Sequence, residues 1–296
     1  MLNEFGGDWT SEKLSCLESY LNAYVRILRK SRYYRIHYVD AFAGSGYISP
    51  THSQDNSELN LFEKETKEAN KYLEGSTRIA LSITPGFDQY IFIEKNSKHS
   101  KALEQLKNEY PNQAPKIRIE NRDANEFLSD WCSQKQFNKI NRAVVFLDPY
   151  GMQVTWSLLE TIAKTEAIDL WILFPVFGAN RMLTKGKQPP QSWADCLTRT
   201  FGTEEWKMRF YETKPVLTLF GEEETTCKSA TIEMIGKFFI NRLQTIFPSV
   251  TKKPLLLCNS KNNPLYLLCF AAANPKGGPI AVKIASDIIN KKSKEQ

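Results

Sequence analysis

The stretch Tyr38-Val39-Asp40-Ala41-Phe42-Ala43-Gly44-Ser45-Gly46-Tyr47 organises the first half of this chain. The apolar run that leads into it, residues 36–39, predicts a strand buried on both faces, as in parallel sheets. The strand stops at Asp40, and a turn containing Gly44 and Gly46 follows. Glycine leaves room for a ligand to approach the backbone, and open α/β sheets bind ligands at the carboxyl ends of their strands. The stretch therefore predicts a ligand site at Asp40.

The spacing within this turn argues against a dinucleotide site. Such a site requires Gly-x-Gly-x-x-Gly, followed by an acid about 20 residues later. Here the third glycine is missing, and the acid, Asp40, comes before Gly44 instead of after it. A carboxylate in this place repels a pyrophosphate and suits a cationic or neutral ligand. A tight turn that binds no ligand is the alternative interpretation.

The composition is that of an ordinary soluble globular protein. Of the 296 residues, 42% are hydrophobic and 24% are charged. No apolar run approaches the ~18 residues needed to span a bilayer, and the N-terminus lacks the basic start and apolar stretch of a secretion signal. These features predict a cytoplasmic protein without membrane association.

Charge and cysteine usage set two further limits. The net charge of +6, from 39 basic and 33 acidic residues, is compatible with a nucleic-acid partner but does not require one. The six cysteines are scattered without a Cys-x-x-Cys pair, and the three histidines do not cluster. We therefore expect free thiols and no metal site.

Strands and helices alternate along the chain as far as Pro175. Apolar runs predict strands at 36–39, 90–94, 116–120, 143–148 and 168–174, with helical segments between them. This alternation predicts a mostly parallel sheet with right-handed crossovers, flanked by helices. Two later strands, at 254–258 and 265–270, are separated by a short polar turn and predict a C-terminal antiparallel hairpin.

Acidic residues lie at or just beyond the ends of four successive predicted strands. They are Asp40, Glu94, Asp123 and Asp148. Because the carboxyl ends of parallel strands meet at one edge of a sheet, we expect these side chains to lie along the same edge. Four acids on one edge favour a ligand site over solvated turns.

Two segments interrupt the pattern within what we treat as a single domain, residues 1–296. Residues 47–75 are an insertion between the glycine turn and its helix, and a long insertion beside a ligand turn is a candidate lid or substrate arm. Residues 176–231 are predicted to be an inserted helical region that contacts substrate or a partner. Its basic residues would meet phosphate, and its aromatic residues would stack on bases. These aromatic residues are Phe177, Trp193, Phe201, Trp206, Phe210 and Tyr211. A helical insertion with its own apolar contacts is the alternative.

The glycine-turn motif and a second motif, Phe146-Leu147-Asp148-Pro149-Tyr150-Gly151-Met152-Gln153, give the chain a resemblance to a known family. It resembles the three-Cys-motif partner family, which is similar to class I S-adenosylmethionine (SAM)-dependent methyltransferases. Two terminal segments, Trp9-Thr10-x-x-Lys13-Leu14 and Pro264-Leu265-Tyr266-Leu267-Leu268, add to the resemblance. It implies a Rossmann-like methyltransferase sheet and a protein partner with a three-cysteine motif, similar to radical-SAM proteins.

The likeness to methyltransferases implies SAM as the cofactor. Asp40 would hold the amino group of the cofactor, and Glu94 would accept hydrogen bonds from its ribose hydroxyls. Asp123 would accept a hydrogen bond from the adenine amino group, and Ala124 would supply a backbone donor. The remaining residues assigned to the cofactor come from the glycine turn, namely Phe42, Gly44 and Gly46.

Asp148, Pro149 and Tyr150 lie where amino-methylating enzymes keep Asp/Asn-Pro-Pro-Tyr/Phe, so the resemblance assigns them to catalysis. A carboxylate and a backbone carbonyl that accept the hydrogens of an exocyclic amine help to localise its lone pair, and an aromatic ring holds the base. The second proline of that motif is missing here. The resemblance therefore leaves two alternatives for the acceptor, the exocyclic amine of guanine and that of adenine. A target within a duplex must be flipped out. A strand-ending proline turn with Tyr150 packed in the core is the alternative.

These inferences predict a SAM-dependent methyltransferase. Its acceptor would be an exocyclic amino group of a nucleobase, in RNA or DNA or in a nucleotide-like molecule. One alternative is a protein that keeps the fold but serves only to dock a three-Cys-motif protein. Another is a nucleotide-processing α/β enzyme that uses the four acids with a metal ion.

Overall fold

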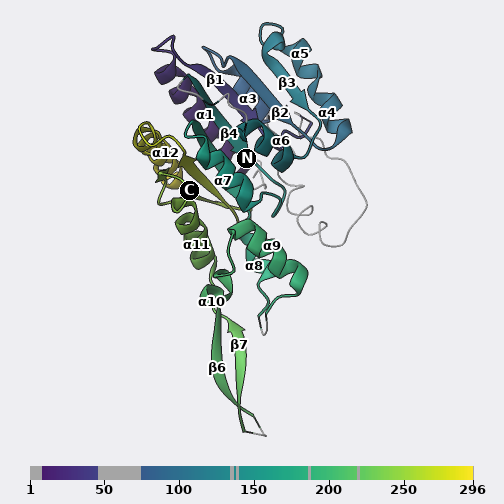
Figure 1. Cartoon of the computed structure of the whole chain (residues 1–296), viewed down its shortest axis with the longest axis vertical. Coiled ribbons are helices and arrows are strands. Elements are labelled where there is room, and N and C mark those ends of the chain that lie inside the picture. The colour runs from purple at the N-terminus through teal and green to yellow at the C-terminus, as the bar shows by residue number, and fades with distance from the viewer. Residues whose placement is uncertain are drawn as a thin grey trace, which may run out of the picture.

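The computed structural model describes residues 9–45, 75–133, 137, 140–185, 188–218 and 221–295 (Figure 1). Gly46 and all but the last residue of the expected insertion 47–75 lie outside the described residues. The main feature is an eight-stranded sheet. Its strands are β1 (Arg35–Asp40), β2 (Gln89–Ile93), β3 (Ile117–Glu120), β4 (Asn141–Leu147), β5 (Ile168–Phe174), β8 (Ser249–Val250), β9 (Leu255–Cys258) and β10 (Pro264–Ala272).

The strand order is β3-β2-β1-β4-β5-β10, and both β8 and β9 pair with β10. The first five strands are parallel, whereas β10 runs antiparallel to β5. In the register of β10, β8 and β9 continue one another as an interrupted edge strand. The expected parallel sheet with a C-terminal antiparallel hairpin, formed by β9 and β10, is confirmed. This order, with an antiparallel strand inserted beside β5, is a Rossmann-like sheet of the class I methyltransferase type.

Helices cover both faces of the sheet (Figure 1). One face carries α1 (Trp9–Leu28), α3 (Ser76–Ser82) and α12 (Gly278–Ser293), and the other carries α6 (Ala124–Ser133), α7 (Trp156–Lys164) and α11 (Ile232–Gln244). Near the β3 edge lie α4 (Ser97–Leu103), α5 (Gln105–Glu109) and a 3-10 turn, Ala114–Lys116. Strand side chains alternate between the two cores: Tyr38 packs with α1, and Val39 packs with α6. Burial on both faces explains why these strands are continuous apolar runs.

The region 176–231 holds both helices and strands. Its helices are α8 (Val176–Met182), α9 (Gln191–Phe201) and α10 (Trp206–Phe210). They lead into β6 (Tyr211–Thr218) and β7 (Gly221–Lys228), an antiparallel hairpin that projects from the body (Figure 1). The prediction of a helical region is therefore wrong for 211–228. Pro215 and the acidic run at 222–224 weaken the usual strand signal, because proline and glutamate are depleted in strands.

Most aromatic residues of this region build the core rather than a surface. Phe201, Trp206, Phe210 and Tyr211 are buried. They pack in the same apolar cluster as α11, where Phe239 stacks on Phe174 with ring centroids 4.0 Å apart. Side chains that pack in the core cannot stack on bases, so the alternative, an insertion with its own apolar contacts, holds for these four.

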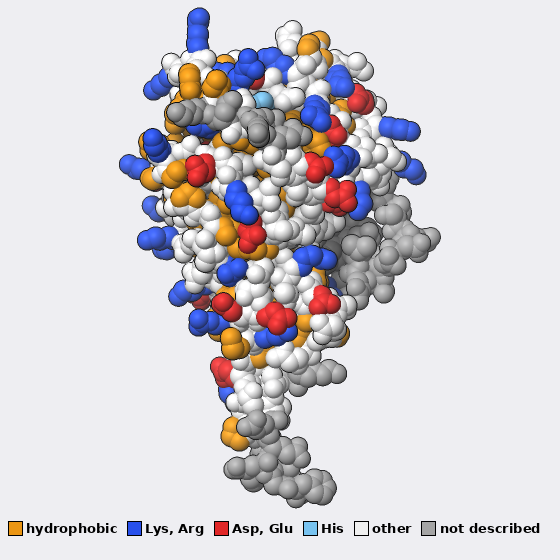
Figure 2. Space-filling view, viewed as in Figure 1, with side chains coloured by type: hydrophobic (Ala, Val, Ile, Leu, Met, Phe, Trp, Pro, Cys, Tyr) orange, Lys and Arg blue, Asp and Glu red, His pale blue; other side chains and the backbone are white. Residues whose placement is uncertain are grey.

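The described surface has no concentrated basic patch on the face shown in Figure 2, where Lys and Arg side chains are spread among Asp and Glu side chains. All six cysteines are free thiols, as expected. Burial raises the pKa of Cys16 and Cys132 to about 12 each, so both thiols stay protonated. Within the described ranges, no helix is both long and apolar enough to cross a membrane.

Candidate active site

The four predicted acids lie at the same edge of the sheet, as the strand pattern predicts. Asp40 is the last residue of β1, and Glu94 directly follows β2. Asp123 lies in the turn after β3, and Asp148 directly follows β4. Because β1 lies between β2 and β4, Asp40 occupies the middle of this edge.

Asp40 is a fully buried carboxyl group with one unused oxygen. Its side chain has 0% exposure. Its Oδ2 accepts hydrogen bonds from the Tyr38 hydroxyl, at 3.3 Å, and from the Ser76 hydroxyl at the start of α3. Its Oδ1 is buried and has no hydrogen-bond partner among the described residues. Buried polar atoms without a partner are rare in native proteins, and a functional site is one of the usual reasons.

The surroundings of Asp40 favour its protonated form. Burial, the largest effect, raises the pKa of this carboxyl to about 7. The hydroxyls of Ser76 and Tyr38 oppose this rise, as does the Phe42 backbone N–H, which lies short of hydrogen-bond geometry. The negative charge of Asp148 raises the pKa further. A cation placed beside Asp40 would restore its ionised form.

The glycine turn is fastened to the end of β2. The Gly44 N–H donates to Oε2 of Glu94 at 2.9 Å, and the Ala43 N–H donates to the Ile93 carbonyl at 3.0 Å. Gly44 has a φ of +60°, a conformation that favours glycine. A Cβ added there would meet no described atom within 4 Å. The space beside the Gly44 α-carbon is therefore open.

Glu94 uses both carboxylate oxygens on backbone groups. Besides Gly44, it accepts a hydrogen bond from the Asn96 N–H at 2.6 Å. Each oxygen of a carboxylate has two acceptor positions, so Glu94 keeps capacity for further donors. Phe42 lies half-buried against the core that α6 and α7 share. Gly46, the second glycine assigned to the cofactor, is outside the described residues.

Asp123 caps α6. Its Oδ1 accepts from the Asn125 N–H at 2.9 Å, and its Oδ2 pairs with Lys95 at 3.2 Å. Burial acts to raise the pKa of Asp123, but Lys95 and the helix N–H groups outweigh it and lower the pKa below its usual value. Ala124 begins α6 and packs in the core. Capping of α6 and the ion pair with Lys95 account for the observed contacts of Asp123.

The three residues assigned to catalysis lie in the loop after β4 and differ in their solvent exposure. Asp148 is half-buried, Pro149 is buried and Tyr150 is 62% exposed. The alternative in which Tyr150 packs in the core is therefore wrong. Asp148 forms an ion pair through Oδ2 with Lys13.

Lys13 belongs to this site, although the sequence motifs assigned it no role there. It comes from the first turns of α1 and is only 7% exposed. Its Nζ lies 4.9 Å from the centroid of the Trp9 ring, and Trp9 stacks on Tyr266 with centroids 5.2 Å apart. A lysine in an amphipathic helix usually lies in solvent, so periodicity could not indicate this burial. The only signal was that the two terminal segments of the family resemblance contain these residues.

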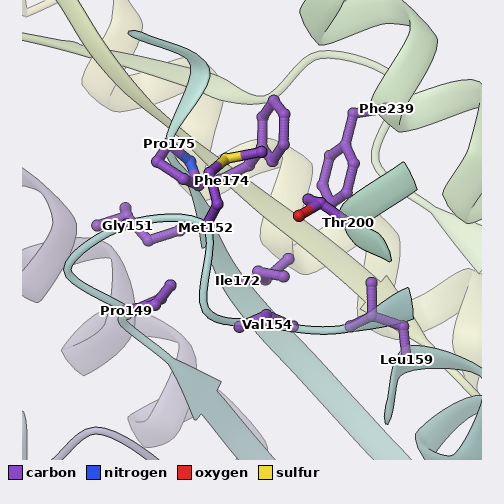
Figure 3. A pocket seen from close by; sticks show the side chains of 11 residues that line it. Pro149, Gly151, Met152, Val154, Leu159, Ile172, Phe174, Pro175, Thr200 and Phe239 are labelled. Carbon is purple, nitrogen blue, oxygen red and sulfur yellow. The ribbon is translucent and has the colours of Figure 1, made fainter. Parts of the chain in front are cut away.

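A small apolar cavity lies beneath the Asp148-Pro149-Tyr150 loop, as Figure 3 shows. Pro149 and Met152 line it from the loop, and Phe174 and Phe239 line it from β5 and α11. The hydroxyl of Thr200 turns toward the cavity, and its Oγ1 is buried without a hydrogen-bond partner among the described residues. Packing of Pro149 and Met152 against this apolar floor holds the loop so that Tyr150 faces outward.

The described ranges contain no group of three or more His, Cys, Asp or Glu side chains that could hold a metal ion. The four acids of the edge therefore do not form a metal-ligand set with one another there. Instead, Asp148 and Asp123 pair with lysines, and Glu94 and Asp40 accept hydrogen bonds from N–H and O–H donors.

Comparison of the sequence with models of known protein families gives no match, and comparison with curated proteins gives none. The resemblance to the three-Cys-motif partner family therefore gains no support from them.

Comparison of the structure with solved structures finds similar folds. Protein LPL1258 from Legionella pneumophila is 10% identical, with a TM-score of 0.48, over 95% of this chain and 92% of that one. The O-methyltransferase TomG from Streptomyces achromogenes, solved in complex with SAM, is 10% identical, with a TM-score of 0.35, over 72% and 79%. The putative methyltransferase yhhF from Escherichia coli is 14% identical, with a TM-score of 0.28, over 72% and 86%. Because these TM-scores are below 0.5, the fold class rests on the strand order of this chain.

Proposed function

We propose that the chain is a SAM-dependent methyltransferase that acts on an exocyclic amino group of a nucleobase, in nucleic acid or in a nucleotide-like molecule. The observation that carries this proposal is Asp40. It is a buried carboxyl group with a raised pKa at the end of the central strand. Among the described residues, one of its oxygens has no hydrogen-bond partner, and the space beside the Gly44 α-carbon is open. A protein keeps such a costly group where a ligand completes it.

The residues at this edge fit the cofactor. The amino group of SAM is a cation with hydrogens to donate, and Oδ1 of Asp40 is an acceptor without a partner among the described residues. The open space at Gly44 lets the cofactor approach the backbone. When bound, SAM supplies an electrophilic methyl group. We assign its amino group to Asp40, its ribose to Glu94 and its adenine to Asp123 and Ala124, with Phe42, Gly44 and Gly46 forming the turn around it.

The acceptor is assigned to the loop after β4. Asp148 and the Pro149 carbonyl accept the hydrogens of the amine, and Tyr150 offers its exposed ring to the base. Accepting both hydrogens localises the nitrogen lone pair that attacks the methyl group. The outward position of Tyr150 supports this assignment, because a ring packed in the core could not stack on an acceptor.

The first test is cofactor binding by the whole chain, measured by calorimetry and by thermal unfolding with SAM and S-adenosylhomocysteine. At 100 times the dissociation constant a ligand stabilises the folded state by ~2.7 kcal/mol. For a chain of this size that free energy corresponds to a rise in melting temperature of about 4 °C. Asp40→Asn should weaken the affinity about 10- to 100-fold, because a charge-assisted hydrogen bond is lost.

Asp169→Asn is the matched control. Asp169 is a second carboxyl group of the same sheet and is half-buried, with a pKa raised by desolvation to about 6, but it lies near the start of β5, away from the edge of the four acids. Replacement of the Asp169 carboxyl group should leave the affinity for SAM unchanged. No melting shift at millimolar SAM in the unaltered chain, or equal losses in the two variants, would contradict the proposal.

The second test identifies the acceptor. Methyl-labelled SAM is incubated with the protein and a cell extract, and the label is sorted into RNA, DNA, protein and small molecules. We expect label in nucleic acid or nucleotides, and loss of that label in Asp148→Ala with SAM affinity retained. Label found only in protein would overturn the assignment of the acceptor but not that of the cofactor.

A further inference from the structure

We propose that Lys13 is a positioning residue that holds Asp148 through one carboxylate oxygen and turns the other oxygen toward the acceptor amine. This inference rests on the proposed function and adds a residue from α1 to the acceptor side of the site. Its basis is the ion pair between Lys13 and Oδ2 of Asp148, which joins the first helix of the chain to the loop after β4.

Lys13 is held in place from two sides. Its ammonium lies over the Trp9 ring, which in turn stacks on Tyr266 of β10, and pairs with Asp148. Its side chain is 8% exposed, against 22% for Asp148. A buried ammonium costs free energy unless it is paired, so this lysine is built into the site rather than resting on the surface. An aromatic face beneath it adds to the stabilisation.

The pairing is one-sided. Lys13 takes Oδ2, while Oδ1 of Asp148 has no hydrogen-bond partner among the described residues. A carboxylate that is fixed through one oxygen presents the other in a defined direction. Asp148 can then accept one hydrogen of the acceptor amine, and the Pro149 carbonyl accepts the other.

The charge of Lys13 matters because two acids are neighbours here. From β1, Asp40 and Tyr38 face Asp148, and from α1 it is faced by Lys13. Ser76 of α3 completes this group through its hydrogen bond to Asp40. Like charges repel each other, and the ammonium of Lys13 offsets this repulsion beside Asp148. Lys13 therefore holds the Asp148 carboxylate in place next to Asp40.

The test compares Lys13→Met, Lys13→Gln and Lys13→Arg in the whole chain. Lys107→Met serves as control, since Lys107 pairs with Glu104 at the surface, away from this site. The resonance of the Asp148 carboxyl carbon is followed at fixed pH by NMR with 13C-labelled aspartate and is assigned with Asp148→Asn. We expect this resonance to shift in Lys13→Met and Lys13→Gln, because the ammonium that holds Oδ2 is removed. Lys107→Met should leave the resonance in place, and Lys13→Arg should keep it close to its original position.

The functional readout is the kcat and KM of methyl transfer. In Lys13→Met and Lys13→Gln kcat should fall at least tenfold while the melting shift with S-adenosylhomocysteine stays the same, and Lys13→Arg should restore kcat. If one charge-removing variant does not fold, the other carries the comparison. An unchanged Asp148 carboxyl resonance, or an unchanged kcat, overturns the role of Lys13. Absence of transfer by the unaltered chain overturns the proposed function instead, and the carboxyl resonance then decides whether Lys13 holds Asp148 in place.

Discussion

Two acids with raised pKa values, Asp40 and the half-buried Asp169, show how differently single residues can be used in one sheet. Asp169 is satisfied, because the Tyr20 hydroxyl donates to it at 2.6 Å. Asp40 has hydroxyl donors on Oδ2 only, and its Oδ1 is left over among the described residues. Both carry a pKa raised by burial. The unsatisfied oxygen therefore distinguishes a site residue from a structural one more clearly than the pKa does.

The raised pKa of Asp40 predicts a pH dependence of stability. In the unfolded chain this carboxyl releases its proton near 3.8, whereas in the folded chain it holds the proton up to about 7. The folded state binds more protons between these values, so the free energy of unfolding falls as the pH rises through this window. The difference corresponds to about 4 kcal/mol if Asp40 acts alone.

Urea unfolding of the unaltered chain and of Asp40→Asn between pH 4 and 8 measures this dependence. The stability of the variant relative to the unaltered chain should increase up to pH 7 and then level off. In Asp169→Asn the corresponding increase should end near pH 6, because the pKa of Asp169 is raised only to about 6. A constant difference between Asp40→Asn and the unaltered chain would show that Asp40 is ionised in the folded protein.

At the scale of elements, the site is assembled from segments far apart in sequence. The central strand β1 supplies Asp40, α3 supplies Ser76 and α1 supplies Lys13. In contrast, β6 and β7 form a sheet of their own, separate from the eight-stranded one. Residues 212–215 of β6 are exposed. The hairpin therefore contributes little to the described core beyond its base at Tyr211, which is buried.

This separation predicts that the hairpin can be shortened without loss of the fold. Thr213 and Thr226 are paired, so residues 214–225 can be replaced by Asn-Gly, a favoured two-residue hairpin turn. The melting temperature should change by less than about 2 °C, since the described residues 212–215 are exposed and exposed side chains contribute little to stability. The shift with S-adenosylhomocysteine should be unchanged. A large drop in melting temperature would show that the outer hairpin packs on the body.

At the scale of the whole molecule, the two edges of the sheet differ in their expected response to cofactor. The edge with the four acids carries the turns after β1, β2, β3 and β4. At the opposite edge an open cleft lies between the ends of α7 and α11, lined by Lys164 and Gln244 among others. A ligand at the first edge stabilises the backbone there and slows its amide hydrogen exchange, whereas amides at the second edge exchange as before.

Hydrogen exchange with and without SAM measures this contrast. We expect added protection from exchange at residues 40–45, 93–96, 121–125 and 148–151. The Gly44 N–H, which donates a hydrogen bond to Glu94, should be among the most protected. Residues 164–168 and 244–248 should exchange at the same rate in both conditions. Protection confined to the cleft between α7 and α11 would place the ligand at the wrong edge and contradict the proposal.

The local hydrophobic pattern of the sequence was sufficient to predict the strands of the main sheet. Apolar runs of strand length, each ending at an acid or a turn, predict the positions of β1 to β5, β9 and β10 to within three residues. This works because strands buried on both faces must be apolar along their whole length. The same reasoning missed β6 and β7, since a hairpin that lies outside the core has no such requirement. It also left open whether Trp206 and Phe210 stack on bases or pack in a core, and the structure shows both buried.

The sequence by itself determined which residues stand at the ends of parallel strands, and with them the edge where Asp40, Glu94, Asp123 and Asp148 meet. Only the tertiary structure decided how each acid is used. Burial and hydrogen-bond partners depend on neighbours from distant segments, such as Ser76 on Asp40 and Lys13 on Asp148. Periodicity describes one element at a time, whereas the ionisation of a carboxyl group depends on every charge and dipole packed around it.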